Sequence, residues 1–125
     1  MLRSIIAVIV LIGAGAATLA GCGGSGCPPF RFPGLDVTVV DDVGEVVCGA
    51  TATATDGAYT EMLAPSPPDG PCYFTGAWER SGVYTVEATF EGRAATRPDV
   101  RVTEGECHVV PEFITIWLPP PASTM

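Results

Sequence analysis

The segment 83–90 alternates apolar and polar residues with a period of two. Tyr84, Val86, Ala88 and Phe90 fall on one side of an extended chain, and mostly polar residues fall on the other. This period is typical of a β-strand that buries one face and leaves the other in water, because successive strand residues point to opposite sides. No segment after position 22 shows the 3.6-residue period of a helix, so we expect an all-β domain.

Turn-forming residues divide the rest of the chain into six further segments that are typical of strands. The seven predicted strands span 35–40, 46–55, 58–63, 72–79, 83–90, 94–103 and 107–118. We expect Pro98 to interrupt the sixth strand and Pro111 to kink or bulge the seventh, because proline has no N–H for the ladder. Strand 72–79 is expected at a sheet edge. Seven short strands joined by turns predict a two-layer sandwich or a small barrel.

The N-terminus has the features of a secretory signal, with one charge at Arg3 followed by the apolar and small-residue segment 5–17. This segment is short for a transmembrane helix. The next residues, Leu19-Ala20-Gly21-Cys22, closely resemble the bacterial lipobox. The resemblance implies cleavage before Cys22 and attachment of diacylglycerol to its thiol, so a membrane is an expected partner. The alternative is an uncleaved anchor helix with an incidental cysteine.

Four regions follow from these features. We expect a signal peptide at 1–21, a lipidated cysteine with a flexible tether at 22–34, a β-sandwich domain at 35–118 and a disordered tail at 119–125. Glycine, and not aspartate, follows Cys22. For a Gram-negative cell, the sorting rule of the lipoprotein family then implies the outer membrane.

The cysteines outside the lipobox are Cys27, Cys48, Cys72 and Cys107. An even number of cysteines in a small exported domain indicates two disulfides, and four cysteines allow three pairings. A metal site is the alternative. However, the sequence contains no Cys-x-x-Cys pair and only one histidine, His108. We therefore expect neither a metal nor another cofactor.

Two stretches resemble carboxypeptidase regulatory-like domains. Residues 36–55 are similar to the family's opening strand, its D-x-x-G-x-P-V turn and its next strand, although Val47-Cys48 replaces Pro-Val. Residues 82–88 match the G-x-Y-x-V-x-V strand, with Ala88 in the last position. The resemblance implies a transthyretin-like, seven-stranded Greek-key sandwich without an activity of its own. The strand arrangement of that family also implies the disulfides Cys27–Cys107 and Cys48–Cys72.

Few residues could carry out chemistry. We expect His108 to be an exposed strand residue beside a disulfide, and every thiol of the predicted domain is assigned to a disulfide, so no catalytic residue is predicted. Asp41 and Asp42 lie in an acidic turn that could bind Ca²⁺ weakly, but a solvated hairpin turn is the favoured interpretation. Trp78 is a candidate contact for a glycan or a protein if it is exposed, and a core residue otherwise.

The chain has a formal net charge of −8 and no lysine, which argues against nucleic acid as a partner. The sequence therefore predicts a non-enzymatic, lipid-anchored protein of the cell envelope. Its sandwich would serve a structural, adhesive or protein-interaction role with an envelope protein. The alternative is a module that binds a small ligand or a carbohydrate.

Overall fold

The computed structural model describes residues 26–67 and 70–122. The predicted signal peptide, Cys22 and the glycine segment 23–25 lie outside the described residues, as do positions 123–125 of the predicted tail. Residues 119–122 are exposed and have no regular secondary structure. Within the described residues no helix could span a membrane.

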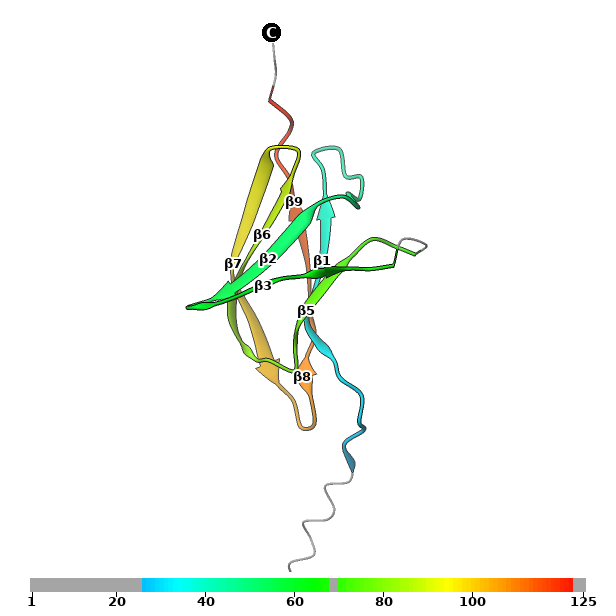
Figure 1. The fold of residues 1–125 in the computed structure, drawn as a ribbon, viewed down its shortest axis with the longest axis vertical. Helices are drawn as coiled ribbons and strands as arrows, with labels where there is room; N and C mark the ends of the chain where they lie inside the picture. The colour runs from blue at the N-terminus through cyan, green and yellow to red at the C-terminus, as the bar shows by residue number, and fades with distance from the viewer. Residues whose placement is uncertain (1–25, 68–69, 123–125) are drawn as a thin grey trace, which may run out of the picture.

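The described chain is all-β and forms two sheets that face each other (Figure 1). One sheet has the strand order β4-β5-β1-β9, and the other has the order β3-β2-β6-β7-β8. The strands are β1 (Pro33–Val40), β2 (Thr51–Asp56), β3 (Tyr59–Met62), β4 (Ala64–Pro65), β5 (Phe74–Trp78), β6 (Gly82–Phe90), β7 (Arg93–Glu104), β8 (Val109–Val110) and β9 (Glu112–Trp117).

The all-β prediction is confirmed, but the described residues form nine strands where seven were expected. One extra strand is the two-residue β4, which lies in the proline-rich loop. The other arises because the predicted strand 107–118 divides at Pro111. Before this residue β8 pairs with β7, and after it β9 pairs with β1, so the chain changes sheets where proline interrupts the ladder.

Three other strand predictions differ in detail from the structure. β2 begins at Thr51 and not at 46, because Val46 makes only an isolated bridge to Val40 before the chain turns away through Cys48. β5 is not the outermost strand of its sheet, since β4 pairs along its outer side. β7 continues through Pro98 without a break. The predicted interruption takes the form of a bulge in the ladder, in which Pro98 and Asp99 lie opposite Thr85 and Asp99 has a φ of 57°.

The core lies between the two sheets and contains no buried polar or charged residue among those described. The alternation in 83–90 works as expected: Tyr84, Val86 and Ala88 are fully buried, whereas Val83, Thr85 and Glu87 are exposed. The facing sheet contributes residues from alternate positions of β1, which are Leu35, Val37 and Val39. Burial of these side chains is the main favourable term for this fold.

Two disulfides are present, Cys27–Cys107 and Cys48–Cys72, and these are the pairs that the family resemblance implies. The first bond fixes the N-terminal segment to the turn between β7 and β8. Residues 27–32 are therefore attached to the domain, and β1 already begins at Pro33. β1 thus begins two residues before the predicted domain boundary at residue 35.

Candidate functional site

The two tryptophans lie at opposite ends of β1. Trp78 pairs with Pro33 at the start of this strand, and Trp117 pairs with Val40 at its end. Eight strand residues separate the two ends by about 23 Å. The N-terminal segment leaves the fold at the Trp78 end, and the C-terminal segment leaves at the other end (Figure 1). The molecule therefore presents two separate aromatic surfaces.

At the C-terminal end, an apolar patch is formed by Trp117, Val43 and Val46, which we call the Trp117 patch. Trp117 is 60% exposed, and its ring packs 3.9 Å from the position that a Cβ on Gly44 would occupy. Val43 and Val46 belong to the loop after β1, and both are exposed. Large apolar side chains gathered in this way at a surface indicate a contact site.

The sequence contains a signal for the exposure of Trp117. In β9, Ile114 and Ile116 are buried, while Phe113 and Trp117 point outward. An aromatic residue on the polar face of an alternating strand indicates exposure. Phe113 lies opposite Asp36 on the same outer sheet face, and burial raises the pKa of the Asp36 carboxyl above its ordinary value.

The acidic turn beside the Trp117 patch is stabilised by hydrogen bonds to the carboxylate of Asp41. The backbone N–H groups of Val43 and Glu45 donate to Asp41 Oδ1 at 3.0 and 2.8 Å. Gly44 has a φ of 88°, which suits a residue without a side chain. Asp41 is thus occupied in shaping the turn. The described residues contain no group of three or more side chains that could hold a metal ion.

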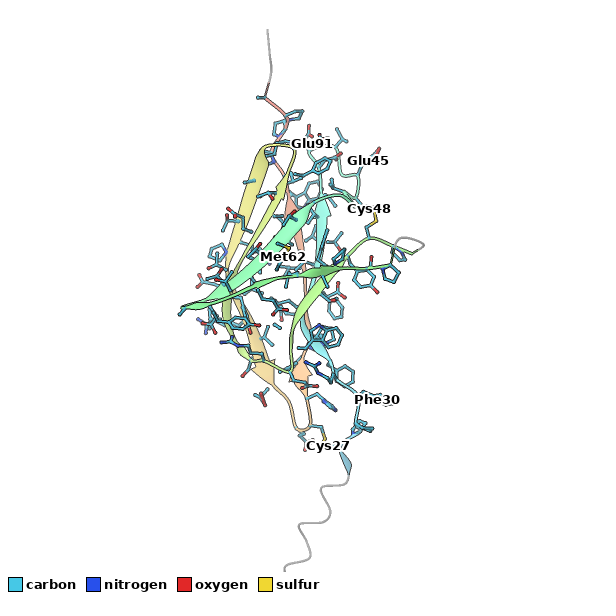
Figure 2. The ribbon with its side chains drawn as sticks, in the orientation of Figure 1. Cys27, Phe30, Glu45, Cys48, Met62 and Glu91 are labelled. Carbon is cyan, nitrogen blue, oxygen red and sulfur yellow. A yellow bond between two sulfur atoms is a disulfide. The ribbon has the colours of Figure 1, made fainter. Side chains whose placement is uncertain are left out.

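Asp42 connects this turn to the hairpin between β6 and β7. Its Oδ1 lies 3.6 Å from Arg93 Nη1, and Arg93 also lies 4.0 Å from Glu91. Glu45 and Glu91 lie at the same end of the molecule (Figure 2). The Trp117 patch therefore has a rim that is mainly acidic.

Trp78, predicted to be a contact residue if exposed and a core residue otherwise, is 39% exposed. The guanidinium carbon of Arg31 lies 5.6 Å from the centre of its ring, in a cation–π contact. Because Trp78 and the turn of Asp41 and Asp42 lie at opposite ends of β1, the structure does not bring these three candidates together.

His108 differs from the prediction of an exposed strand residue. It lies in the turn before β8, and its side chain is only 15% exposed. Nδ1 lies 2.5 Å from Glu79 Oε2, and Nε2 lies 3.1 Å from the carbonyl oxygen of Pro28. The ring also packs edge-on against Phe32. Both ring nitrogens are occupied, so this histidine fastens the N-terminal segment to the domain.

Glu79 is the centre of this cluster, which we call the Glu79 clamp. Its carboxylate accepts the backbone N–H groups of Phe32 at 2.9 Å and Val109 at 3.1 Å, in addition to contacting His108. Desolvation raises the pKa of Glu79, but these two backbone hydrogen bonds and His108 outweigh it, so the pKa lies below its usual range.

A second polar cluster lies at the rim of the core around Arg80. Its guanidinium lies 3.7 Å from the ring centre of Tyr59, donates to Tyr84 Oη at 2.9 Å and pairs with Asp56 at 3.1 Å. The Tyr84 hydroxyl donates in turn to the carbonyl of Arg80. This network satisfies the hydroxyl of a fully buried tyrosine and is structural.

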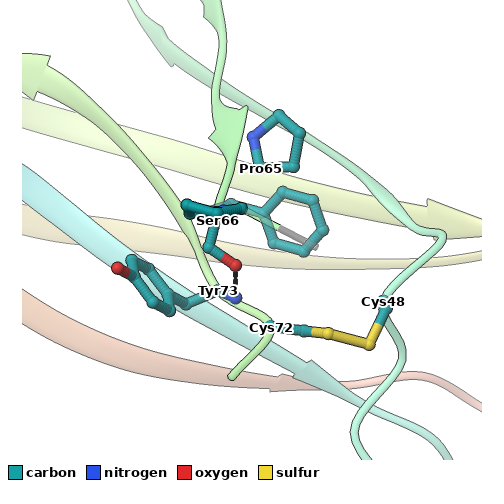
Figure 3. Close-up of a pocket in the computed structure, with 7 residues that line it drawn as sticks. Cys48, Pro65, Ser66, Cys72 and Tyr73 are labelled. Atoms are coloured by element: carbon teal, nitrogen blue, oxygen red, sulfur yellow. Dashed lines mark hydrogen bonds between the residues drawn. A yellow bond between two sulfur atoms is a disulfide. The ribbon is translucent and has the colours of Figure 1, made fainter. Parts of the chain in front are cut away.

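A shallow apolar cavity of about 380 Å³ lies beside the Cys48–Cys72 disulfide (Figure 3). Pro65, Pro67, Tyr73 and Phe74 contribute to its walls. Ser66 shapes it from one side, because its hydroxyl accepts the N–H of Tyr73 and donates to the carbonyl of Pro71. The walls offer apolar contact and few polar groups that could fix a ligand.

No protein-family model matches the chain, and no curated protein or solved structure is significantly similar to it. The carboxypeptidase regulatory-like resemblance and the lipobox therefore remain interpretations of the sequence.

Proposed function

We propose that this protein is a lipoprotein of the cell envelope, anchored through Cys22, that presents the Trp117 patch to a protein partner away from the membrane. The observation that supports it most is the position of the patch at the end of the fold opposite the N-terminal segment. A lipid attached at Cys22 would hold the domain by the end that carries Cys27. The patch would then face away from the bilayer.

The chemistry of the Trp117 patch supports a protein as the partner. Tryptophan in the middle of a contact, with smaller apolar residues beside it and charges at the rim, is the usual composition of an interaction hot spot. Asp42, Glu45 and Glu91 outnumber the single Arg93 around it. The complementary surface would therefore be basic with an apolar centre.

The role is binding and not catalysis. His108, the only histidine, is occupied on both nitrogens, and Cys27, Cys48, Cys72 and Cys107 are in disulfides. Among the described residues, these contacts leave no unoccupied imidazole and no free thiol for nucleophilic chemistry. A transthyretin-like sandwich is our proposal for the topology, supported by the parallel pairing of β1 with β9.

A carbohydrate ligand is the second candidate, and one observation favours it. Trp117 combines an exposed ring with nearby carboxylates, which is suitable for stacking and hydrogen bonding to a sugar. Titration with soluble glycans distinguishes the two candidates. Saturable quenching of Trp117 fluorescence by a glycan supports this candidate, and an unchanged signal supports a protein partner.

Anchoring is tested by metabolic labelling with a fatty-acid precursor in cells. We expect label in the unaltered protein and none in the Cys22→Ser variant. Label that persists in Cys22→Ser would contradict the proposed anchor.

The partner surface is tested by placing a photo-crosslinking residue at Val43 in the lipidated protein. We expect an adduct of defined mass that disappears when Trp117 is changed to Ala. The same crosslinker at Thr53, on the outer face of the other sheet, is the matched control. Equal adducts at both positions would argue against a specific patch.

A further inference from the structure

The end of the fold that carries the N-terminal segment is also aromatic. Phe30 is 66% exposed, Phe32 is 36% exposed and Trp78 is 39% exposed. Arg31 is exposed among them and stacks on Trp78. We call these four residues the Trp78 patch. It lies about the length of β1 away from the Trp117 patch.

The chain holds this patch close to residue 22. Cys27 lies only five positions after Cys22, and Cys27 is bonded to Cys107 in the folded domain. Five extended residues span at most about 18 Å. Phe30 and Cys27 lie together at this end (Figure 2). A lipid on Cys22 would therefore keep the aromatic residues within reach of the headgroup region.

The Glu79 clamp keeps the patch in a fixed shape. Phe32 forms two hydrogen bonds with Glu79. Its N–H donates to the Glu79 carboxylate, and its carbonyl accepts the Glu79 N–H at 3.0 Å. His108 contacts the ring of Phe32 and the carbonyl of Pro28. The aromatic side chains thus project from a segment attached to the domain.

We infer that the Trp78 patch docks on the surface of the bilayer, as a second membrane contact beside the lipid anchor. The inference rests on the proposed anchoring at Cys22. Phenylalanine and tryptophan rings enter the interfacial region readily, and an arginine beside them places its charge at the headgroups. Diacylglycerol supplies two acyl chains, which already give a stable attachment, so an additional contact would mainly set the orientation of the domain on the bilayer.

The charged residues at this end of the fold do not favour an anionic lipid surface. Arg31 is the cation of the patch, while Glu104 at the end of β7 and Glu106 in the turn after it are both exposed. These carboxylates would remain hydrated and would be repelled by anionic headgroups. The rings, and not the charges, drive docking, so zwitterionic phosphatidylcholine is the appropriate surface.

The two tryptophans provide the test. The acylated protein is reconstituted into phosphatidylcholine vesicles that contain brominated lipid, as single-tryptophan variants Trp117→Phe and Trp78→Phe. We expect the lipid to quench Trp78 in the first variant and to leave Trp117 in the second unquenched. The protein with both tryptophans should show partial quenching, which reports on docking without any substitution. Addition of phosphatidylglycerol should not increase quenching.

The variant Phe30→Ser distinguishes docking from mere closeness to the bilayer through the tether. It keeps the lipid anchor and removes one ring of the Trp78 patch. We expect loss of Trp78 quenching in this variant and no loss in Val43→Ser, an exposed apolar residue at the other end. Acylated protein that floats with the vesicles while Trp78 stays unquenched would overturn docking and leave the anchor intact. Stronger quenching of Trp117 would also overturn it. Absence of acylation at Cys22 would instead refute the proposed anchoring, and the docking inference would fall with it.

Discussion

Glu79 Oε2 lies 2.5 Å from Nδ1 of His108, although the two residues are 29 positions apart. The same carboxylate accepts backbone N–H groups from Phe32 and Val109. One side chain at the end of β5 therefore connects the N-terminal segment to the start of β8. This connection gives the domain a pH-dependent component of stability.

We expect acid to weaken the fold through Glu79. Its pKa is depressed in the folded protein, so its contribution is complete above the unfolded-state pKa of about 4.3 and is lost as the pH falls through the lower folded-state pKa. Glu79→Gln should lower Tm at pH 7 and reduce the fall in Tm between about pH 5 and pH 2. The measurement is a series of thermal melts followed by circular dichroism.

The control for this prediction is Glu104→Gln, an exposed carboxylate near the same end of the fold. It should leave both Tm and its pH dependence nearly unchanged. If Glu79→Gln and the unaltered protein lose Tm in parallel over the acid range, the Glu79 clamp does not contribute as described.

The disulfides should differ in their effect on stability. Cys27–Cys107 closes a loop of 80 residues, and Cys48–Cys72 closes one of 24. Restriction of the unfolded chain predicts losses of about 4–5 and about 3 kcal/mol when each pair is replaced by serine. Urea unfolding of the two double variants in a Cys22→Ser background measures both. The reverse order would show that native contacts, and not loop length, set the difference.

The parts of the fold that were predictable depend on local pattern. Segment 83–90 was recognised because its burial alternates with the strand period, and the observed strand is Gly82–Phe90. Pro111 was recognised as a disruption for the same local reason. The change of sheet at Pro111 was not, because residues before and after it have equivalent patterns and only the pairing with β7 or β1 distinguishes them.

The candidate sites were harder to predict, since they join distant residues. His108 is flanked in sequence by acidic and apolar residues, and nothing local indicates that Glu79 will reach it. Trp78 and Asp41 were each candidates for binding, but β1 separates them, which no local pattern indicates. Trp117 was recognisable in principle, because it follows two buried isoleucines on the opposite face of one strand.

Tyr84→Phe should destabilise the domain by about 1–2 kcal/mol. The tyrosine is fully buried, and its hydroxyl both donates to the carbonyl of Arg80 and accepts from its guanidinium. Removal of the hydroxyl leaves these two partners, at the rim of the core, less well satisfied. Tyr73→Phe is the control, because Tyr73 is only partly buried. Equal effects in urea unfolding would indicate that the Arg80 network is not the cause.

The outer edge of β9 leads to the last prediction. β9 pairs with β1 on one side, and no strand of the described chain pairs with its other side. Arg97 instead donates to the carbonyl of Thr115 at 3.3 Å, and Arg93 donates to the carbonyl of Pro119 at 3.2 Å. Charged side chains that cover an open edge hinder pairing with another chain.

Arg97→Ala should therefore promote association of a Cys22→Ser form at high protein concentration while changing its stability little, because Arg97 is exposed. Light scattering after size-exclusion chromatography measures the mass, and we expect dimers or larger species relative to the unaltered protein. Arg101→Ala removes an equal charge from the same strand, where the side chain makes no hydrogen bond to β9, and should not associate. If the two variants behave alike, the loss of charge explains the result. If Arg97→Ala remains as monodisperse as the unaltered protein, Arg97 does not protect the edge.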